Sequence, residues 1–135
     1  MNGSIEYLNP DKLNKNPAFT NVIVVQGNTK TVYIAGQNSV NENREIIGRG
    51  DIKAQTEQVL INLLIALKAG GAKLEDVIKL NVYIVHGQHL QSAYLVFQNY
   101  WGNRQNPPTL TLLYVSGLAN TDFLIEMDAI AVVPE

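Results

Sequence analysis

The chain has 135 residues, 46% of them hydrophobic and 16% charged, which predicts one compact domain over residues 1–135 with a real core. The formal net charge is -2 and the ten Lys and Arg residues are scattered, so no clustered basic surface for nucleic acid is expected. The absence of cysteine excludes thiol chemistry and disulfides and fits a reducing compartment.

The first residues lack the basic and apolar regions of a signal peptide, and no apolar run is long enough to cross a membrane. We therefore expect a cytoplasmic protein with no membrane partner.

The N-terminal third is predicted to hold short strands and loops. Residues 1–16 are polar and form an N-terminal edge segment, in which Ser4 to Leu8 is at best a short edge strand. The β-branched runs Val22–Gln26 and Thr31–Ala35 flank residues 27–30, whose composition is typical of a hairpin turn. Residues 38–50 are rich in Asn, Gly and charge, which predicts a mobile surface loop.

The middle of the chain predicts two helices and the strand between them. Asp51 has the position of an N-cap, and apolar residues recur at helical spacing from Ile52 to Ala69, before a stop at Gly70 and Gly71. Residues 77–85 alternate as a strand whose inward positions are Ile78, Leu80, Val82 and Ile84. An aromatic stripe from Leu90 to Trp101 predicts the second helix, closed by Gly102. We expect this stripe to pack in the core or an interface in preference to stacking on a ligand.

The last third, residues 107–133, contains two apolar runs separated by the turn-like residues 119–122, which predicts a hairpin of two strands. Within the second run, Leu124, Glu126, Asp128 and Ile130 share one face of the strand. A carboxylate inside an apolar strand needs a hydrogen-bond partner or water, because burying it alone costs several kcal/mol. Glu126 therefore marks either a wet groove or a structural polar contact.

The predicted order is β-β-α-β-α-β-β, an α+β fold with both helices on one face of a mixed sheet. The other face would then be polar or packed on another chain. Its predicted outward residues are too apolar as a set for open water, which favours self-association; they include Tyr33, Tyr83, Val85 and Tyr114.

Three segments resemble the YjgF/Rid family of imine and enamine deaminases, over about residues 17–133. The stretch Val32–Gln37 resembles the family strand that ends in Ser-Gly-Gln, and Ala69–Lys79 resembles its Ala-Gly-x-x-x-x-Asp-Val-x-Lys segment. The C-terminal signature is matched by Pro108-Thr109-Leu110-Thr111, followed by Ile125-Glu126-Met127 and Ala129-Ile130-Ala131. The resemblance implies a chorismate-mutase-like fold and a homotrimer with three small-molecule clefts at the subunit interfaces.

The resemblance also implies the residues of each cleft. Glu126 matches the family glutamate that positions the attacking water, whereas Leu110 replaces the arginine that clamps a substrate carboxylate. Other departures are Ala35 for Ser beside the retained Gly36 and Gln37, Phe19 for Tyr, Tyr94 for Asn, and Leu112 for Cys next to Thr111. Because these exchanges remove charge or polarity, we expect a neutral or apolar small-molecule ligand and no cofactor.

Other interpretations of these residues stay open. An enamine or imine deaminase could still use Glu126 to position water, and an interaction scaffold is a further alternative. Glu126 and Asp128 as a glycosidase pair are disfavoured because both lie on one strand with no acid partner elsewhere. The only histidines, His86 and His89, are expected in a solvated turn instead of a metal site.

Overall fold

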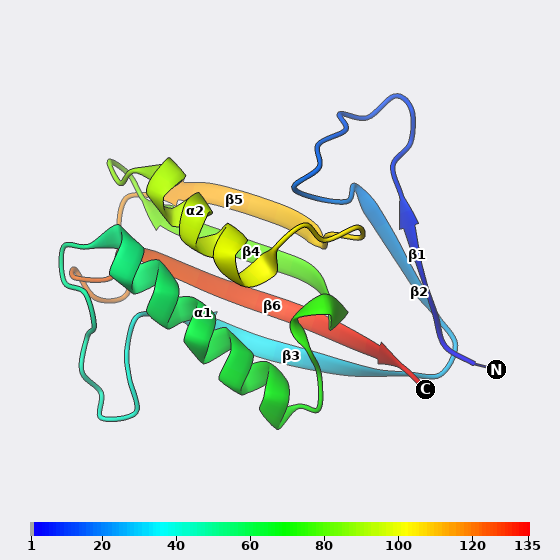
Figure 1. Ribbon diagram of the computed structural model, residues 1–135, viewed down its shortest axis with the longest axis horizontal. Coiled ribbons are helices and arrows are strands. Elements are labelled where there is room, and N and C mark those ends of the chain that lie inside the picture. The colour runs from blue at the N-terminus through cyan, green and yellow to red at the C-terminus, as the bar shows by residue number, and fades with distance from the viewer. Residues whose placement is uncertain (1) are drawn as a thin grey trace.

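A computed structural model describes residues 2–135. Figure 1 shows two helices lying across one face of a sheet, with a separate strand pair beside one end of that sheet. The α+β class, with both helices on one face of a mixed sheet, is therefore confirmed. The elements are β1 Ser4–Leu8, β2 Val22–Gln26, β3 Thr29–Gln37, α1 Ile52–Ala69, a 3-10 turn Leu74–Asp76, β4 Val77–Val85, α2 Leu90–Trp101, β5 Thr109–Val115 and β6 Ile125–Pro134.

Both predicted hairpins are wrong. The main sheet has the order β3-β6-β4-β5, so β4 lies between the two C-terminal strands and pairs with β5 in parallel and with β6 antiparallel. Strand β2 pairs with β1, in the register Ser4 to Gln26, and not with β3. Turn composition marks a break between strands, but it does not determine which strands become neighbours.

The β1–β2 pair is fastened at both ends. The backbone N–H of Thr20 donates to the carbonyl of Pro108 at 3.0 Å, and its hydroxyl donates to that of Pro107 at 2.5 Å. At the other end, the N–H of Glu135 donates to Asn28 at 2.9 Å. The pair therefore runs beside the sheet from the start of β5 to the end of β6, as Figure 1 shows.

The helix boundaries follow the predicted caps. The Asp51 side chain accepts hydrogen bonds from the amides of Lys53 and Ala54, which would otherwise be free in the first turn of α1. Gly71, with a φ of 74°, supplies the left-handed conformation after α1, and Gly102 does so after α2 with a φ of 66°. Residues 38–50 contain only an isolated bridge between Val40 and Ile46.

The core lies between the helices and the sheet and includes Leu60 and Leu63 of α1 and Leu80 and Ile84 of β4. Strand β6 alternates as predicted, with Ile125, Met127, Ala129 and Ala131 buried toward the helices. In β4 a register shift between Val77 and Lys79 buries Val77 completely and leaves Ile78 only partly buried, contrary to the prediction.

One predicted outward residue also lies on the other face. Tyr114 is opposite Ile84 in the parallel β4–β5 register, so it shares the helix side with Leu110 and Leu112. Leu113 is opposite Tyr83 and takes the outward position. The outward face therefore still carries exposed large apolar side chains, with Tyr33 77% exposed and Leu113 48% exposed.

Candidate functional site

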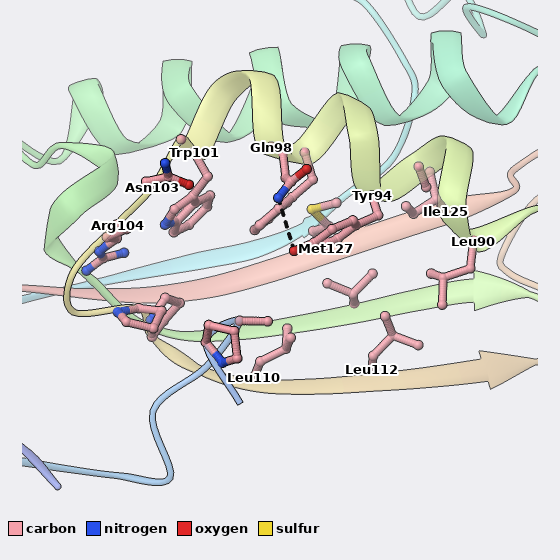
Figure 2. Close-up of a pocket in the computed structure, with 18 residues that line it drawn as sticks. Leu90, Tyr94, Gln98, Trp101, Asn103, Arg104, Leu110, Leu112, Ile125 and Met127 are labelled. Carbon is pink, nitrogen blue, oxygen red and sulfur yellow. Dashed lines mark hydrogen bonds between the residues drawn. The ribbon is translucent and has the colours of Figure 1, made fainter. Parts of the chain in front are cut away.

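A cavity of about 270 Å³ opens between α2 and the β4–β5 side of the sheet. Figure 2 shows the side chains of α2 reaching down toward Leu110 and Leu112, which point up from β5. Helical spacing places Leu90, Tyr94, Phe97, Gln98 and Trp101 on this side of α2. The floor comes from β4 and β6 and includes Val82, Ile125 and Met127.

The N-terminal segment closes one side of the cavity. Pro17 and Ala18 belong to its lining, together with Pro107 and Pro108 at the start of β5. Thr20 is 2% exposed, and its two hydrogen bonds to these prolines hold the segment in place. The cavity wall therefore depends on the unexpected position of the β1–β2 pair.

One end of the cavity is formed by Trp101 and Arg104. The Trp101 ring stacks on Phe97, with centroids 4.8 Å apart and planes 14° apart, and the Arg104 guanidinium lies 5.5 Å from the indole centroid. Arg104 donates to the carbonyls of Leu74, Glu75 and Val77, at 3.3, 2.5 and 2.9 Å.

Arg104 is thus a cation whose guanidinium is largely engaged by the backbone. Burial lowers its pKa, while Tyr7, Glu75 and Asp76 act in the opposite direction. The two carboxylates offset its charge, so this end of the cavity does not present a free anion clamp. A second cavity of about 270 Å³ shares Trp101, Asn103 and Arg104 and continues toward Tyr100.

The predicted site residues fall on two sides of the sheet. Tyr94, Leu110 and Leu112 line the cavity, and Phe19 belongs to the segment beside it but is not among the lining residues. Thr111 is exposed and, opposite Asn81 in the β4–β5 register, lies on the outward face.

Glu126 also lies on the outward face, where its carboxylate lies against Gly36 of β3. Gly36 lies so close that a β-carbon there would overlap the Glu126 carboxylate, and the side chain of Gln37 turns back to the carbonyl of Ala35 at 3.1 Å. Asn38 donates to Oε1 of Glu126 at 3.1 Å. Asn38 was not predicted as a site residue. The available signal was its position directly after Gln37, the last residue of β3.

The outward face carries a second carboxylate with its own partners. Asn81 donates to Asp128 at 2.9 Å, and Tyr83 lies near this carboxylate. Burial first, and then the negative charges of Asp128 and Glu126, raise the pKa of Tyr83. Within one chain, each of the two carboxylates accepts a hydrogen bond from an asparagine amide, on the side of the sheet away from the cavity.

The lining residues that the sequence did not single out for ligand contact include Phe97, Gln98, Trp101 and Arg104. The aromatic stripe of α2 was predicted to serve packing, and the structure shows that part of it packs while part lines a cavity. The available signal was the number of large apolar or aromatic residues on one face of a 12-residue helix, namely Leu90, Tyr94, Phe97 and Trp101.

The remaining features give no separate site. The ring Nδ1 of His89 lies 2.7 Å from Ser92 Oγ, and His86 meets Tyr114 edge to face. Among residues 2–135 there is no cluster of three or more His, Cys, Asp or Glu side chains that could hold a metal ion. Neither helix in that range is long and apolar enough to span a membrane.

Comparison with known proteins gives matches across most of the chain. The model of the family described as endoribonuclease L-PSP matches residues 13–133. A RutC family protein of Pyrococcus horikoshii is 39% identical over 100 residues, which cover 74% of this chain and 77% of that protein. The crystal structure of the Rid family protein YyfB of Yersinia pestis has a TM-score of 0.82 at 30% identity and covers 96% of this chain and 98% of that one.

A shorter match concerns a named activity. A 2-iminobutanoate/2-iminopropanoate deaminase of Dermatophagoides farinae is 35% identical over 54 residues, which cover 40% of this chain and 42% of that protein.

Proposed function

Because the chain belongs to the endoribonuclease L-PSP family, the YjgF/Rid family, we propose that it handles a small molecule, and that this molecule is neutral and largely apolar. The observation that carries the proposal is Leu110, which occupies the arginine position of the family signature and lines the cavity beside Leu112. A carboxylate loses its hydration when it enters the cavity, and a hydrocarbon wall offers no hydrogen bonds or charge to replace it. The same wall favours an aromatic or aliphatic ligand, because apolar surface is buried on binding.

The site is proposed to work in a homotrimer, with each cavity completed by a neighbouring copy. Exposed Tyr33 and Leu113 on the outward face support association, since a second chain would cover them. Glu126 lies on that same face, so a neighbour could bring its carboxylate to a cavity that it cannot line within its own chain.

The experiment uses Trp101, the only tryptophan of the chain, as a reporter inside the cavity. We expect benzamide to change its fluorescence saturably and benzoate, which has the same size but carries a charge, to bind much more weakly. Leu112→Asn should weaken benzamide binding because it places an amide in the apolar wall. Leu95→Asn is the control, because Leu95 is exposed on α2 and outside the cavity lining. No saturable response to any neutral aromatic ligand would refute the proposal.

A second candidate is an imine deaminase of altered specificity, supported by the partial match to the Dermatophagoides enzyme and by Glu126. The test is ammonia release from freshly generated neutral imines and from 2-iminobutanoate. Glu126→Gln is the matched variant, since glutamine keeps an oxygen that can accept from Asn38 but removes the charge that orients water. Activity that survives Glu126→Gln unchanged would exclude this mechanism.

A ribonuclease function, which the family description mentions, finds little support in this chain. The net charge of -2 and the scattered Lys and Arg residues do not provide the basic surface on which phosphate binding depends. The interaction scaffold likewise has no specific observation in its favour.

A further inference from the structure

The indole nitrogen of Trp101 is buried at the end of the cavity and, within residues 2–135, has no hydrogen-bond partner. In Figure 2 this nitrogen is on the side of the ring that faces Arg104. Buried indole N–H groups are almost always paired, because an unpaired donor forfeits the hydrogen bonds that it made with water. Because Trp101 lines the cavity, a ligand in the cavity is a possible source of the missing acceptor.

No side chain or carbonyl of residues 2–135 pairs with this N–H, although Asn103 lines the same end of the cavity. The neighbouring Arg104 is a donor only, and it already takes the carbonyls of Leu74, Glu75 and Val77. The stack on Phe97, with planes 14° apart, fixes the ring so that the indole cannot easily turn its nitrogen elsewhere. The unpaired N–H is therefore open to an acceptor that a ligand brings into the cavity.

We propose that Trp101 Nε1–H is the specificity-determining donor of the site, and that it receives one neutral acceptor oxygen of a ligand whose body fills the apolar cavity. This inference rests on the proposed function. It narrows the ligand class to aromatic or alicyclic molecules that carry a ketone, amide or ether oxygen at one end. A carboxylate is disfavoured at this end because Glu75 and Asp76 already offset the charge of Arg104.

The experiment removes the N–H donor while keeping an aromatic ring of similar shape. Because Trp101 is the only tryptophan, growth of a tryptophan auxotroph on 3-benzothienylalanine replaces the indole N–H at this single position with a sulfur of similar shape. The two proteins are compared with 1-indanone, which has a carbonyl oxygen, and indane, which does not. Binding is measured by ligand-observed NMR, which needs no fluorophore, and unfolding midpoints confirm that both proteins are folded.

The native protein should bind 1-indanone more tightly relative to indane than the substituted protein does, by about threefold to tenfold, the usual range for one neutral hydrogen bond. The single indole N–H resonance of the native protein should also move downfield with 1-indanone and not with indane. If both ligands bind but the ratio and the resonance do not change, the cavity is correct and the role of Trp101 is wrong. If neither ligand binds either protein, the proposed function itself fails.

Discussion

The carboxylate of Glu126 lies directly against the backbone of Gly36, across the pairing of β3 with β6, and leaves no room there for a β-carbon. This contact joins the family-matched Gly-Gln pair of β3 to the family-matched glutamate of β6. With Asn38 donating to Oε1, the carboxylate has a defined position on the outward face of the sheet.

Gly36→Ala is therefore expected to destabilise the protein or to displace Glu126. The added methyl group would overlap the carboxylate, and such overpacking typically costs about 1–3 kcal/mol. Chemical denaturation gives the free energy of unfolding. Gly117→Ala is the control, because its β-carbon would meet nothing within 4 Å. Equal stabilities for the two variants would show that the Gly36 contact is not tight in solution.

Thr20→Val tests the wall made by the N-terminal segment. Valine has nearly the shape of threonine but cannot donate to Pro107, so a partly buried hydrogen bond is lost at a cost of about 1 kcal/mol. We expect a lower unfolding free energy and weaker benzamide binding, because Pro17 and Ala18 would no longer be held against the cavity. Exposed Thr31 on β3 provides the control in Thr31→Val. Unchanged stability and binding would mean that the wall does not need this hydrogen bond.

Stability should fall in alkaline solution through two tyrosines. Burial and neighbouring carboxylates raise the pKa of Tyr83, beside Asp128, and of Tyr100, beside Glu57. The folded protein thus keeps these phenolic protons more tightly than the unfolded chain, whose tyrosines titrate near about pH 10. This stabilisation is complete below that pH and is lost as the pH rises through the higher folded-state values.

Thermal unfolding from pH 8 to 11 measures the effect. The midpoint should decline above about pH 10, and Tyr83→Phe, which cannot ionise, should decline less steeply than the parent. A decline of the same steepness in both proteins would assign the alkaline sensitivity to other groups.

Light scattering after size exclusion tests the proposed assembly. The expected mass is three times the 14.9 kDa of the chain. Tyr33→Lys should reduce it, since a charge on the exposed outward face would have to be desolvated in an interface. Lys53→Glu, on α1 and away from that face, should leave the mass unchanged. A monomeric parent protein would refute the proposed trimer.

Much of the fold could be predicted from local signals. The predicted bounds of both helices and of β4 agree with the observed ones. They were set by the cap at Asp51, by the glycines after each helix and by the period-2 pattern of β4. The pairing of strands could not be predicted, because the same turn composition serves a hairpin and a strand that crosses to another neighbour. Gly27 lies directly after β2, but β2 pairs with the preceding strand β1 and not with the following strand β3.

The site could be predicted only as a set of residues. Alternation placed Glu126 on the face of Asp128, and the resemblance pointed to Leu110 and Leu112, but whether the helix-side face would be hollow depended on how α2 packs. Tyr114, predicted to point outward, lies on the helix side because it is two residues from Leu112 along β5. The role of Arg104 could not be predicted, because its three carbonyl partners, on Leu74, Glu75 and Val77, are distant in the sequence.

The most direct test of the central claim is the preference between benzamide and benzoate, measured in the parent protein and in Leu110→Arg. The parent should bind benzamide at least about tenfold more tightly, because the cavity has no free cation to replace the hydration of a carboxylate. Leu110→Arg should reverse the preference, since a guanidinium at this position can bind benzoate with two hydrogen bonds. A parent protein that binds benzoate as tightly as benzamide would contradict the account.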